Sequence, residues 1–207
     1  RPHPGGEPHV LDPDLVDDRD ARRGDAPGPS VGVATRNRGC RVDDRCNSGL
    51  GETIACTPGK VVHRTDLFEL IQYSPATADV LETPLVIFPP WINRFYILDL
   101  NPKKSFVKWA VEQGVTVFMV SWRSADESMA EVSWDDYVRA QIEAIDVVRE
   151  RLGVPAVHTI GYCVAGTTLA ATLAILARRG EAGKVASATF LTAQVDFKFA
   201  GDLKLFV

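Results

Sequence analysis

The stretch that decides the fold reads Val157-His158-Thr159-Ile160-Gly161-Tyr162-Cys163-Val164-Ala165-Gly166 and continues into an apolar segment. Residues 156–160 are mostly β-branched or apolar, which predicts a buried strand. Residues 164–178 follow with the composition of a helix, so the chain must turn sharply at Cys163. Small residues stand two positions before Cys163 and two and three positions after it, as a turn with closely approaching backbones requires. The pattern predicts that Cys163 projects above the carboxyl end of a strand.

Gly-x-Cys-x-Ala-Gly is the pattern of a nucleophile elbow in which Cys replaces Ser. The predicted helix begins directly after Cys163, so its N–H groups and positive dipole end favour the reactive thiolate form. The N–H of Val164 is then placed to stabilise the oxyanion that forms when a carbonyl is attacked. The same turn has two other interpretations: a strand-to-helix turn that holds a structural cysteine, or a phosphate loop. A phosphate loop would need Gly-x-Gly-x-x-Gly or Lys-Ser/Thr, and neither pattern occurs here.

Residues 51–207 alternate between strand and helix patterns. The expected strands are 61–64, 68–72, 84–88, 115–122, 156–160 and 185–195, and the expected helices are 105–113, 134–152 and 164–178. In the longest helix, the predicted core stripe consists of Tyr137, Ile142, Ile145, Val148 and Leu152. This alternation predicts an α/β fold with a mostly parallel sheet covered on both faces. Together with the elbow it indicates a partial α/β-hydrolase core over residues 51–207.

The first fifty residues have a different composition, with no Phe, Tyr, Trp, Ile, Met or Lys. Such a segment cannot bury enough apolar surface to offset the entropy of ordering it, so residues 1–50 are predicted to be disordered. Either a natural solvated tail or a GC-rich gene read out of frame would give this composition. Neither origin assigns a function to the segment.

Composition excludes several classes of function. The net charge of -4 over 207 residues gives no reason to expect a nucleic-acid partner, and the apolar runs are too short for a membrane span. No secretory signal is visible, which predicts a cytoplasmic protein whose cysteines are reduced. These are Cys40, Cys46, Cys56 and Cys163, and without a CxxC pair they suggest no metal site and no cofactor.

Six blocks of sequence carry a resemblance to a known family. They are residues 57–62 (TPGKVV), 70–73 (LIQY), 89–100 (PPWINRFYILDL), 111–114 (VEQG), 120–123 (VSWR) and 161–167 (GYCVAGT). From about Arg41 to the last residue, the chain resembles the class I polyhydroxyalkanoate (poly-3-hydroxybutyrate) synthases. In that family the box reads Gly-x-Cys-x-Gly-Gly, so Ala165 adds one methyl group, which we expect to leave activity intact.

The resemblance implies an acyltransferase that polymerises (R)-3-hydroxyacyl groups from coenzyme A thioesters into a storage polyester. Cys163 would hold the acyl group as a thioester, which stays activated for transfer to the hydroxyl of the next monomer. The implied partners are the hydroxyacyl-CoA substrate, the surface of the polyester granule and a second copy of the chain in a homodimer.

A nucleophilic cysteine also needs a histidine base and an acid that orients it. In this fold both follow the nucleophile along the chain, but only Asp196 and Asp202 follow Cys163 as acids. All four histidines precede it: His3, His9, His63 and His158. We expect His158 to be a packed strand residue and Asp196 to cap a turn. The resemblance places the base and its acid beyond Val207, so we expect a fragment that is inactive alone.

The loop Pro89-Pro90-Trp91-Ile92-Asn93 follows an apolar strand, where such folds supply a second oxyanion donor. A backbone N–H near Trp91 or Ile92 is predicted to donate, and Asn93 to contact substrate. The alternative is a tight turn in which Trp91 and Tyr96 only pack. Two rival functions for the chain are a Cys-nucleophile thioesterase or dienelactone-type hydrolase, and a non-catalytic α/β module.

Overall fold

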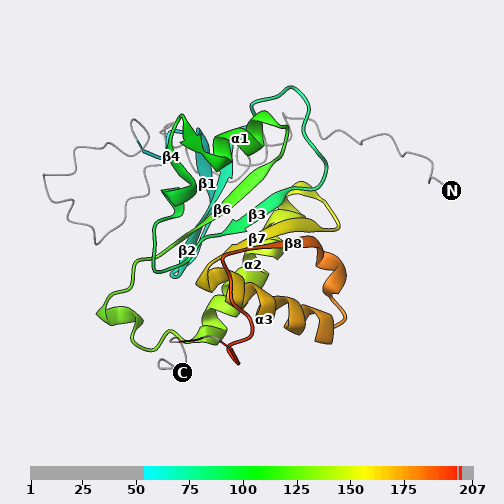
Figure 1. The fold of residues 1–207 in the computed structure, drawn as a ribbon. Helices are drawn as coiled ribbons and strands as arrows, with labels where there is room; N and C mark the ends of the chain where they lie inside the picture. Colours follow the sequence, from blue (N-terminus) through cyan, green and yellow to red (C-terminus); the bar gives the residue numbers. More distant parts are fainter. Residues whose placement is uncertain (1–53, 200, 202–207) are drawn as a thin grey trace, which may run out of the picture.

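The computed structural model describes residues 54–199 and 201, so the predictions for residues 1–50 lie outside the described residues. A six-stranded sheet forms the centre of the fold, in the order β1-β2-β6-β3-β7-β8 (Figure 1). These strands are β1 Gly59–Arg64, β2 Phe68–Tyr73, β3 Leu85–Phe88, β6 Val117–Trp122, β7 Val157–Tyr162 and β8 Val185–Leu191. β6, β3, β7 and β8 run parallel, whereas β2 pairs antiparallel with both β1 and β6. The predicted α/β fold with a mostly parallel sheet is confirmed.

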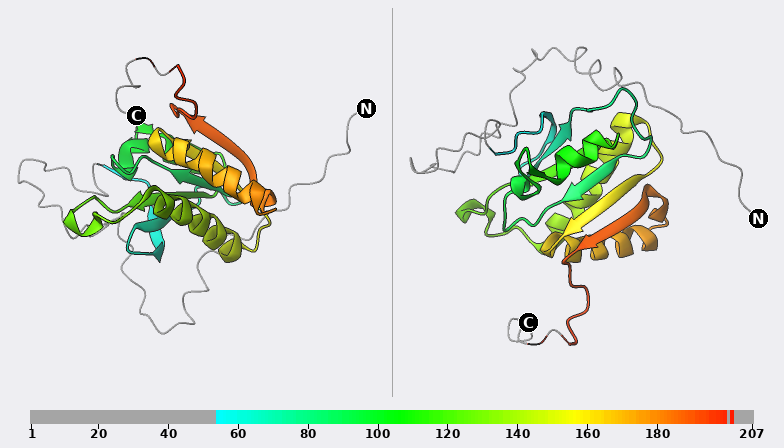
Figure 2. Two further views of the ribbon diagram at one scale, coloured as in Figure 1. Left: turned by 90° about the horizontal axis from the view of Figure 1, so that it is seen from below. Right: turned by 45° about the horizontal axis from the view of Figure 1, so that its top comes forward.

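The helices cover both faces of the sheet. They are α1 Phe106–Glu112, α2 Trp134–Leu152 and α3 Val164–Arg178. Figure 2 shows α1 on one side of the sheet and α2 with α3 on the other. Because successive strand residues point to opposite faces, β3 feeds two cores: Ile87 packs on the α1 side, and Val86 and Phe88 pack on the α2 and α3 side.

The ends of α2 lie where the sequence predicts them. Ser133 is the N-cap and forms a capping box with Asp136, and Gly153 ends the helix in the left-handed conformation with φ 67°. The buried face differs from the predicted stripe. It consists of Val138, Ala140, Gln141, Ala144, Ile145 and Val148. Tyr137, Ile142 and Leu152 are only half-buried, so the core-facing stripe is rotated towards Gln141.

Smaller elements connect the strands. They are the 3-10 helices η3 Phe95–Leu98, η4 Glu127–Met129 and η5 Ala182–Lys184, and the hairpin of β4 Asp99–Asn101 with β5 Lys104–Ser105. The last strand ends at Leu191, whereas the sequence predicts a strand over residues 185–195. The next residue, Thr192, has a positive φ of 48°, which interrupts the extended backbone. Residues 192–199 form a loop instead.

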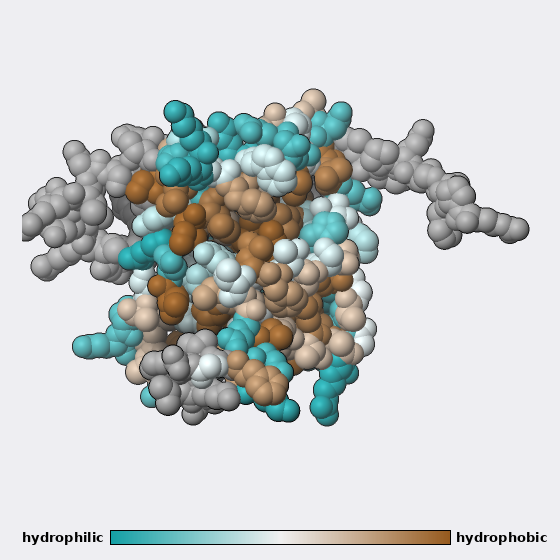
Figure 3. All heavy atoms as spheres, in the orientation of Figure 1, coloured by the Kyte–Doolittle hydropathy of each residue, from teal (hydrophilic) through white to brown (hydrophobic). Residues whose placement is uncertain are grey.

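β8 is an edge strand in the described part of the chain, and its side chains are mostly exposed or half-buried. Phe190 on this strand is 41% exposed, and Val195, Phe197 and Phe199 in the following loop are exposed as well. In Figure 3, apolar residues gather in the middle of the visible face, with polar residues around them.

Candidate active site

Cys163 lies between β7 and α3 with φ 55° and ψ -129°, a backbone conformation that residues other than glycine rarely adopt. Hydrogen bonds fix this peptide from both sides. The Cys163 N–H donates to the Leu191 carbonyl at 2.8 Å, and its own carbonyl accepts from the N–H groups of Gly166 and Thr167, at 2.9 and 3.2 Å. The strained conformation is therefore held by β8 on one side and by the first turn of α3 on the other.

The two glycines of the box meet across the turn. A β-carbon on Gly161 would stand 2.5 Å from the Gly166 Cα, and one on Gly166 would stand 2.5 Å from the Cβ of Ala193. The predicted close approach of strand and helix is thus present at these two positions. Ala165, in the first turn of α3, is fully buried and belongs to the core cluster that α2 and α3 share.

Val164 is the first residue of α3, and N–H groups at this position have no partner within a helix. The half-buried Cys163 precedes it directly, so the thiol stands at the amino end of a fifteen-residue helix. This arrangement suits attack on a carbonyl by sulfur with an N–H donor beside it. The oxyanion role of Val164 remains a prediction.

The loop after β3 leaves the sheet at the carboxyl ends of the parallel strands, the same end at which Cys163 lies. Phe88, the last residue of β3, pairs in parallel with Gly161. The carbonyl of Pro89 accepts a hydrogen bond from the indole Nε1 of Trp122 at 2.7 Å, which anchors the start of the loop. The carboxyl ends of neighbouring parallel strands form the usual ligand crevice of such sheets. The loop therefore lies on the side where the sequence analysis placed it.

The Trp91 side chain packs on α2. Its ring stacks on Tyr137 at 4.1 Å with an interplanar angle of 20°, and it meets Trp134 and Trp122 edge-on at 5.4 and 6.2 Å. Burial, and secondarily the charge of Asp136, raises the pKa of Tyr137. Trp91 therefore has the packing role of the alternative interpretation, and any donation would come from backbone N–H groups.

Ile92 and Asn93 are exposed, at the tip of the same loop. Ile92 is 77% exposed, and the Asn93 side-chain oxygen accepts from the N–H of Arg94 at 2.8 Å. The Asn93 N–H donates to the Pro90 carbonyl at 3.0 Å, which closes a tight turn. Their predicted contacts with an oxyanion or a substrate remain predictions.

Neither described histidine reaches Cys163. His63 lies on β1, with β2, β6 and β3 between it and β7, and its Nε2 is 2.8 Å from Glu143 Oε1. His158 bonds through Nδ1 to the Ser187 hydroxyl at 2.8 Å. It precedes Cys163 by five residues of strand, or about 16 Å at 3.3 Å per residue. The packed-strand interpretation of His158 fits this geometry.

Asp196 shapes the loop after β8. Its carboxylate accepts from the Lys198 N–H at 2.9 Å, and its carbonyl accepts from the Gln194 side chain at 3.2 Å. The Thr167 hydroxyl on α3 donates to the Gln194 carbonyl at 2.7 Å, which joins this loop to the elbow helix. Asp196 thus caps a turn, as expected, and Asp202 lies outside the described residues.

Gln141 is a residue of the site that sequence reasoning missed. This α2 side chain is fully buried, and its Nε2 donates to the Ala165 carbonyl at 3.0 Å. The Thr172 hydroxyl donates to its Oε1 at 2.8 Å. Glutamine on an amphipathic helix is normally read as solvent-facing, and the only available signal was its position between the apolar residues Val138 and Ile145.

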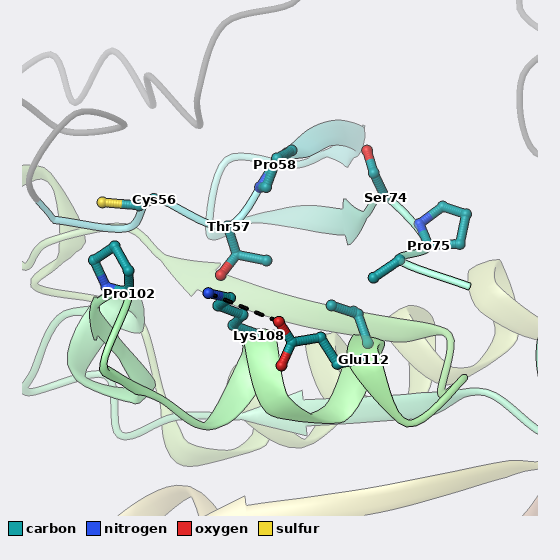
Figure 4. A pocket seen from close by; sticks show the side chains of 10 residues that line it. Cys56, Thr57, Pro58, Ser74, Pro75, Pro102, Lys108 and Glu112 are labelled. Carbon is teal, nitrogen blue, oxygen red and sulfur yellow. Dashed lines mark ion pairs between the residues drawn. The ribbon is translucent and has the colours of Figure 1, made fainter.

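A separate pocket of about 250 Å³ lies beside α1 (Figure 4). Its lining residues are Cys56, Thr57, Pro58, Ser74, Pro75, Ala76, Pro102, Lys108, Val111 and Glu112. Lys108 and Glu112 form an ion pair at 3.7 Å on its α1 wall. None of the lining residues belongs to β7, α3 or the loop after β3, so the pocket is distinct from the Cys163 site.

Within residues 54–199 and 201, no three His, Cys, Asp or Glu side chains are grouped so that they could hold a metal ion. Within the same residues, no helix has the length and apolar character needed to cross a membrane.

Comparison with protein families gives two matches. The family described as "alpha/beta hydrolase fold" matches residues 75–206. The family described as "Poly-beta-hydroxybutyrate polymerase (PhaC) N-terminus" matches residues 35–110. The chain is also similar to a solved structure from a study of two esterases of Rhizomucor miehei, with a TM-score of 0.51, 16% identity, and coverage of 70% of this chain and 46% of that one. At this identity the likeness shows the fold alone.

Three curated relatives are similar over most of this chain. A poly(3-hydroxyalkanoate) polymerase subunit of Rhizobium meliloti is 52% identical over 81% of this chain and 27% of the relative. A poly(3-hydroxyalkanoate) polymerase of Methylorubrum extorquens is 54% identical over 76% of this chain and 26% of the relative. A polymerase subunit of Cupriavidus necator is 48% identical over 76% and 27%. The chain thus spans about a quarter of the length of these relatives.

Proposed function

Because this chain belongs to the alpha/beta hydrolase fold family and is a homologue of the poly(3-hydroxyalkanoate) polymerases, we propose that Cys163 is the acyl-accepting nucleophile of a polyester-forming acyltransferase. The observation that carries the proposal is the backbone of Cys163, which is held at φ 55° and ψ -129° between β7 and α3. A structural cysteine has no need of such strain, whereas a nucleophile must be lifted above the sheet.

The proposed substrate is an (R)-3-hydroxyacyl-CoA thioester. The Cys163 thiolate attacks its carbonyl carbon, and the negative charge moves to the carbonyl oxygen. The N–H of Val164 and a backbone N–H at Trp91 or Ile92 stabilise this oxyanion, and Asn93 contacts the substrate. Collapse of the tetrahedral adduct expels coenzyme A as its thiolate and leaves the acyl group on sulfur.

Chain growth then requires an alcohol. The hydroxyl of a second monomer or of the growing polymer attacks the acyl-cysteine, forms the ester and returns Cys163 as a thiolate. The hydroxyl must lose its proton in this step, which calls for a general base. His63 and His158 are both bonded elsewhere, so the proposal assigns the base to neither of them.

Under this proposal the protein acts in the cytoplasm, where the sequence predicts it. From the family resemblance come two further expectations: that it acts at the surface of a polyester granule and that it forms a homodimer. No metal or organic cofactor takes part, because thioester exchange needs only a thiolate, an oxyanion site and a base.

Incubation of the chain with 3-hydroxybutyryl-CoA tests whether Cys163 accepts an acyl group, a step in which the thiolate is the attacking form. We expect release of coenzyme A and a mass increase of one hydroxybutyryl group on the peptide that contains Cys163. Cys163→Ala removes this adduct, and Cys56→Ser leaves it in place. Acylation of Cys163 no faster than that of Cys56 would refute the nucleophile role, and free hydroxy acid formed at each turnover would favour a thioesterase.

A further inference from the structure

We propose that Gln141 is a positioning residue for Cys163, which fixes the first turn of α3 against α2 through a buried carboxamide. The inference rests on the proposed role of Cys163 as nucleophile. The contact joins α2 to the first turn of α3, two residues after Cys163.

The burial of Gln141 demands an explanation, because a polar side chain in a core is costly unless its hydrogen bonds are made. Its side chain is 0% exposed and lies on the same face of α2 as Ala144 and Val148, where an apolar residue would serve packing alone. Both ends of its amide are bonded, to the Ala165 carbonyl at 3.0 Å and to the Thr172 hydroxyl at 2.8 Å. Gln141 is therefore committed to α3 through two directional contacts.

The two partners of Gln141 lie on one face of α3, seven residues or about two turns apart. Helix carbonyls point towards the carboxyl end and side chains lean towards the amino end, so one carboxamide meets both groups. Two contacts at different positions resist both sliding of α3 along α2 and rotation about its own axis. Hydrophobic contacts alone are non-directional and resist these movements less.

Movement of α3 would be felt directly at the nucleophile. Ala165 lies two residues after Cys163, and its neighbour Gly166 donates to the Cys163 carbonyl at 2.9 Å. A strained residue keeps its conformation only while its surroundings determine it. If the first turn of α3 shifts, Cys163 can relax and its sulfur leaves the end of the helix. Gln141 thus supports the presentation of the thiol.

The experiment uses the full 207-residue chain and compares iodoacetamide alkylation of Cys163 with that of Cys56, peptide by peptide, by mass spectrometry. Gln141→Met keeps the approximate length of the side chain and removes both hydrogen bonds. We expect the ratio of Cys163 to Cys56 rates to fall about fivefold or more, because one typical net hydrogen bond corresponds to a factor of about five and Gln141→Met removes two. Thr172→Val removes one bond at equal volume and should lower the ratio in the same direction.

Val148→Ala is the matched structural control. It removes buried volume from the same face of α2 without touching the Gln141 contacts, so it should lower the free energy of unfolding and leave the ratio unchanged. If Gln141→Met does not fold, Thr172→Val alone decides. A ratio in the folded Gln141 or Thr172 variants equal to or above the wild-type ratio would overturn the inference. A wild-type Cys163 that reacts no faster than Cys56 would instead overturn the proposed nucleophile.

Discussion

Gly161 and Gly166 touch across the turn that carries Cys163, since a β-carbon on Gly161 would stand 2.5 Å from the Gly166 Cα. One glycine ends the buried part of β7 and the other lies in the first turn of α3. The contact leaves no room for a side chain between strand and helix. The contact therefore fixes how closely the start of α3 approaches the end of β7. It also fixes the position of the Cys163 thiol above the sheet.

Gly161→Ala should destabilise the protein by at least about 2 kcal/mol, because overpacking a filled site forces backbone to move. Gly183→Ala is the matched control, since nothing lies within 4 Å of a β-carbon built there. Urea unfolding of the three proteins measures the effect. A Gly161→Ala protein as stable as the Gly183→Ala protein would contradict the close approach.

Cys163→Gly should be more stable than Cys163→Ala, by about 1 kcal/mol. Relief of strain at a residue with φ 55° contributes about 1–3 kcal/mol, and the greater freedom of glycine in the unfolded chain offsets part of it. Both variants lose the reactive thiol, so the comparison isolates the backbone. Equal urea midpoints, or a less stable glycine variant, would show that the turn is not strained.

Much of this fold follows from patterns that the sequence shows locally. The helix over residues 134–152 has a cap at Ser133 and a stop at Gly153, and its ends are predicted correctly. Its buried face is not, because Gln141 enters the core only through partners on α3, which no local pattern displays. The antiparallel pairing of β1 and β2 likewise depends on long-range contacts that periodicity does not specify.

In the site, too, local sequence patterns predict some features, and others depend on long-range contacts. The spacing of Gly161, Cys163 and Gly166 is enough to predict the turn, since sterics alone require small residues there. The packing of Trp91 on Tyr137 brings together residues 46 positions apart, so the sequence could present Trp91 only as an alternative between packing and donation. Side-chain partners across elements are the part that needed the structure.

Asp136→Asn should lower the free energy of unfolding at neutral pH but not in strong acid. The hydroxyl of Ser133, its N–H and the guanidinium of Arg139 hold the pKa of Asp136 well below its usual range. A lowered folded-state pKa gives stability that is present above the unfolded value of about 3.9 and is lost as pH falls through the folded value. The stability gap between wild type and Asp136→Asn should therefore close as the pH falls below about 3.9.

Urea unfolding at a series of pH values measures that gap. Asp135→Asn is the neighbouring control, because Asp135 is exposed and accepts no hydrogen bond within the described residues. Its effect on stability should be smaller than that of Asp136→Asn at neutral pH. A gap for Asp136→Asn that persists unchanged in strong acid would show that the carboxylate charge does not stabilise this helix start.

Trp91→Ala tests whether the loop after β3 matters for the chemistry as well as for packing. Loss of the stack on Tyr137 and of the contacts with Trp122 and Trp134 should cost about 2–3 kcal/mol of unfolding free energy. Trp109→Ala is the control, since that side chain is 56% exposed and its loss should cost less than about 1 kcal/mol.

If a backbone N–H of this loop helps to bind the oxyanion, a loop released from α2 should slow acylation of Cys163 by 3-hydroxybutyryl-CoA. Removal of one such donor typically costs about 100-fold or more, and partial displacement less. An unchanged acylation rate in folded Trp91→Ala protein would remove the loop from the proposed site and leave Trp91 with packing alone.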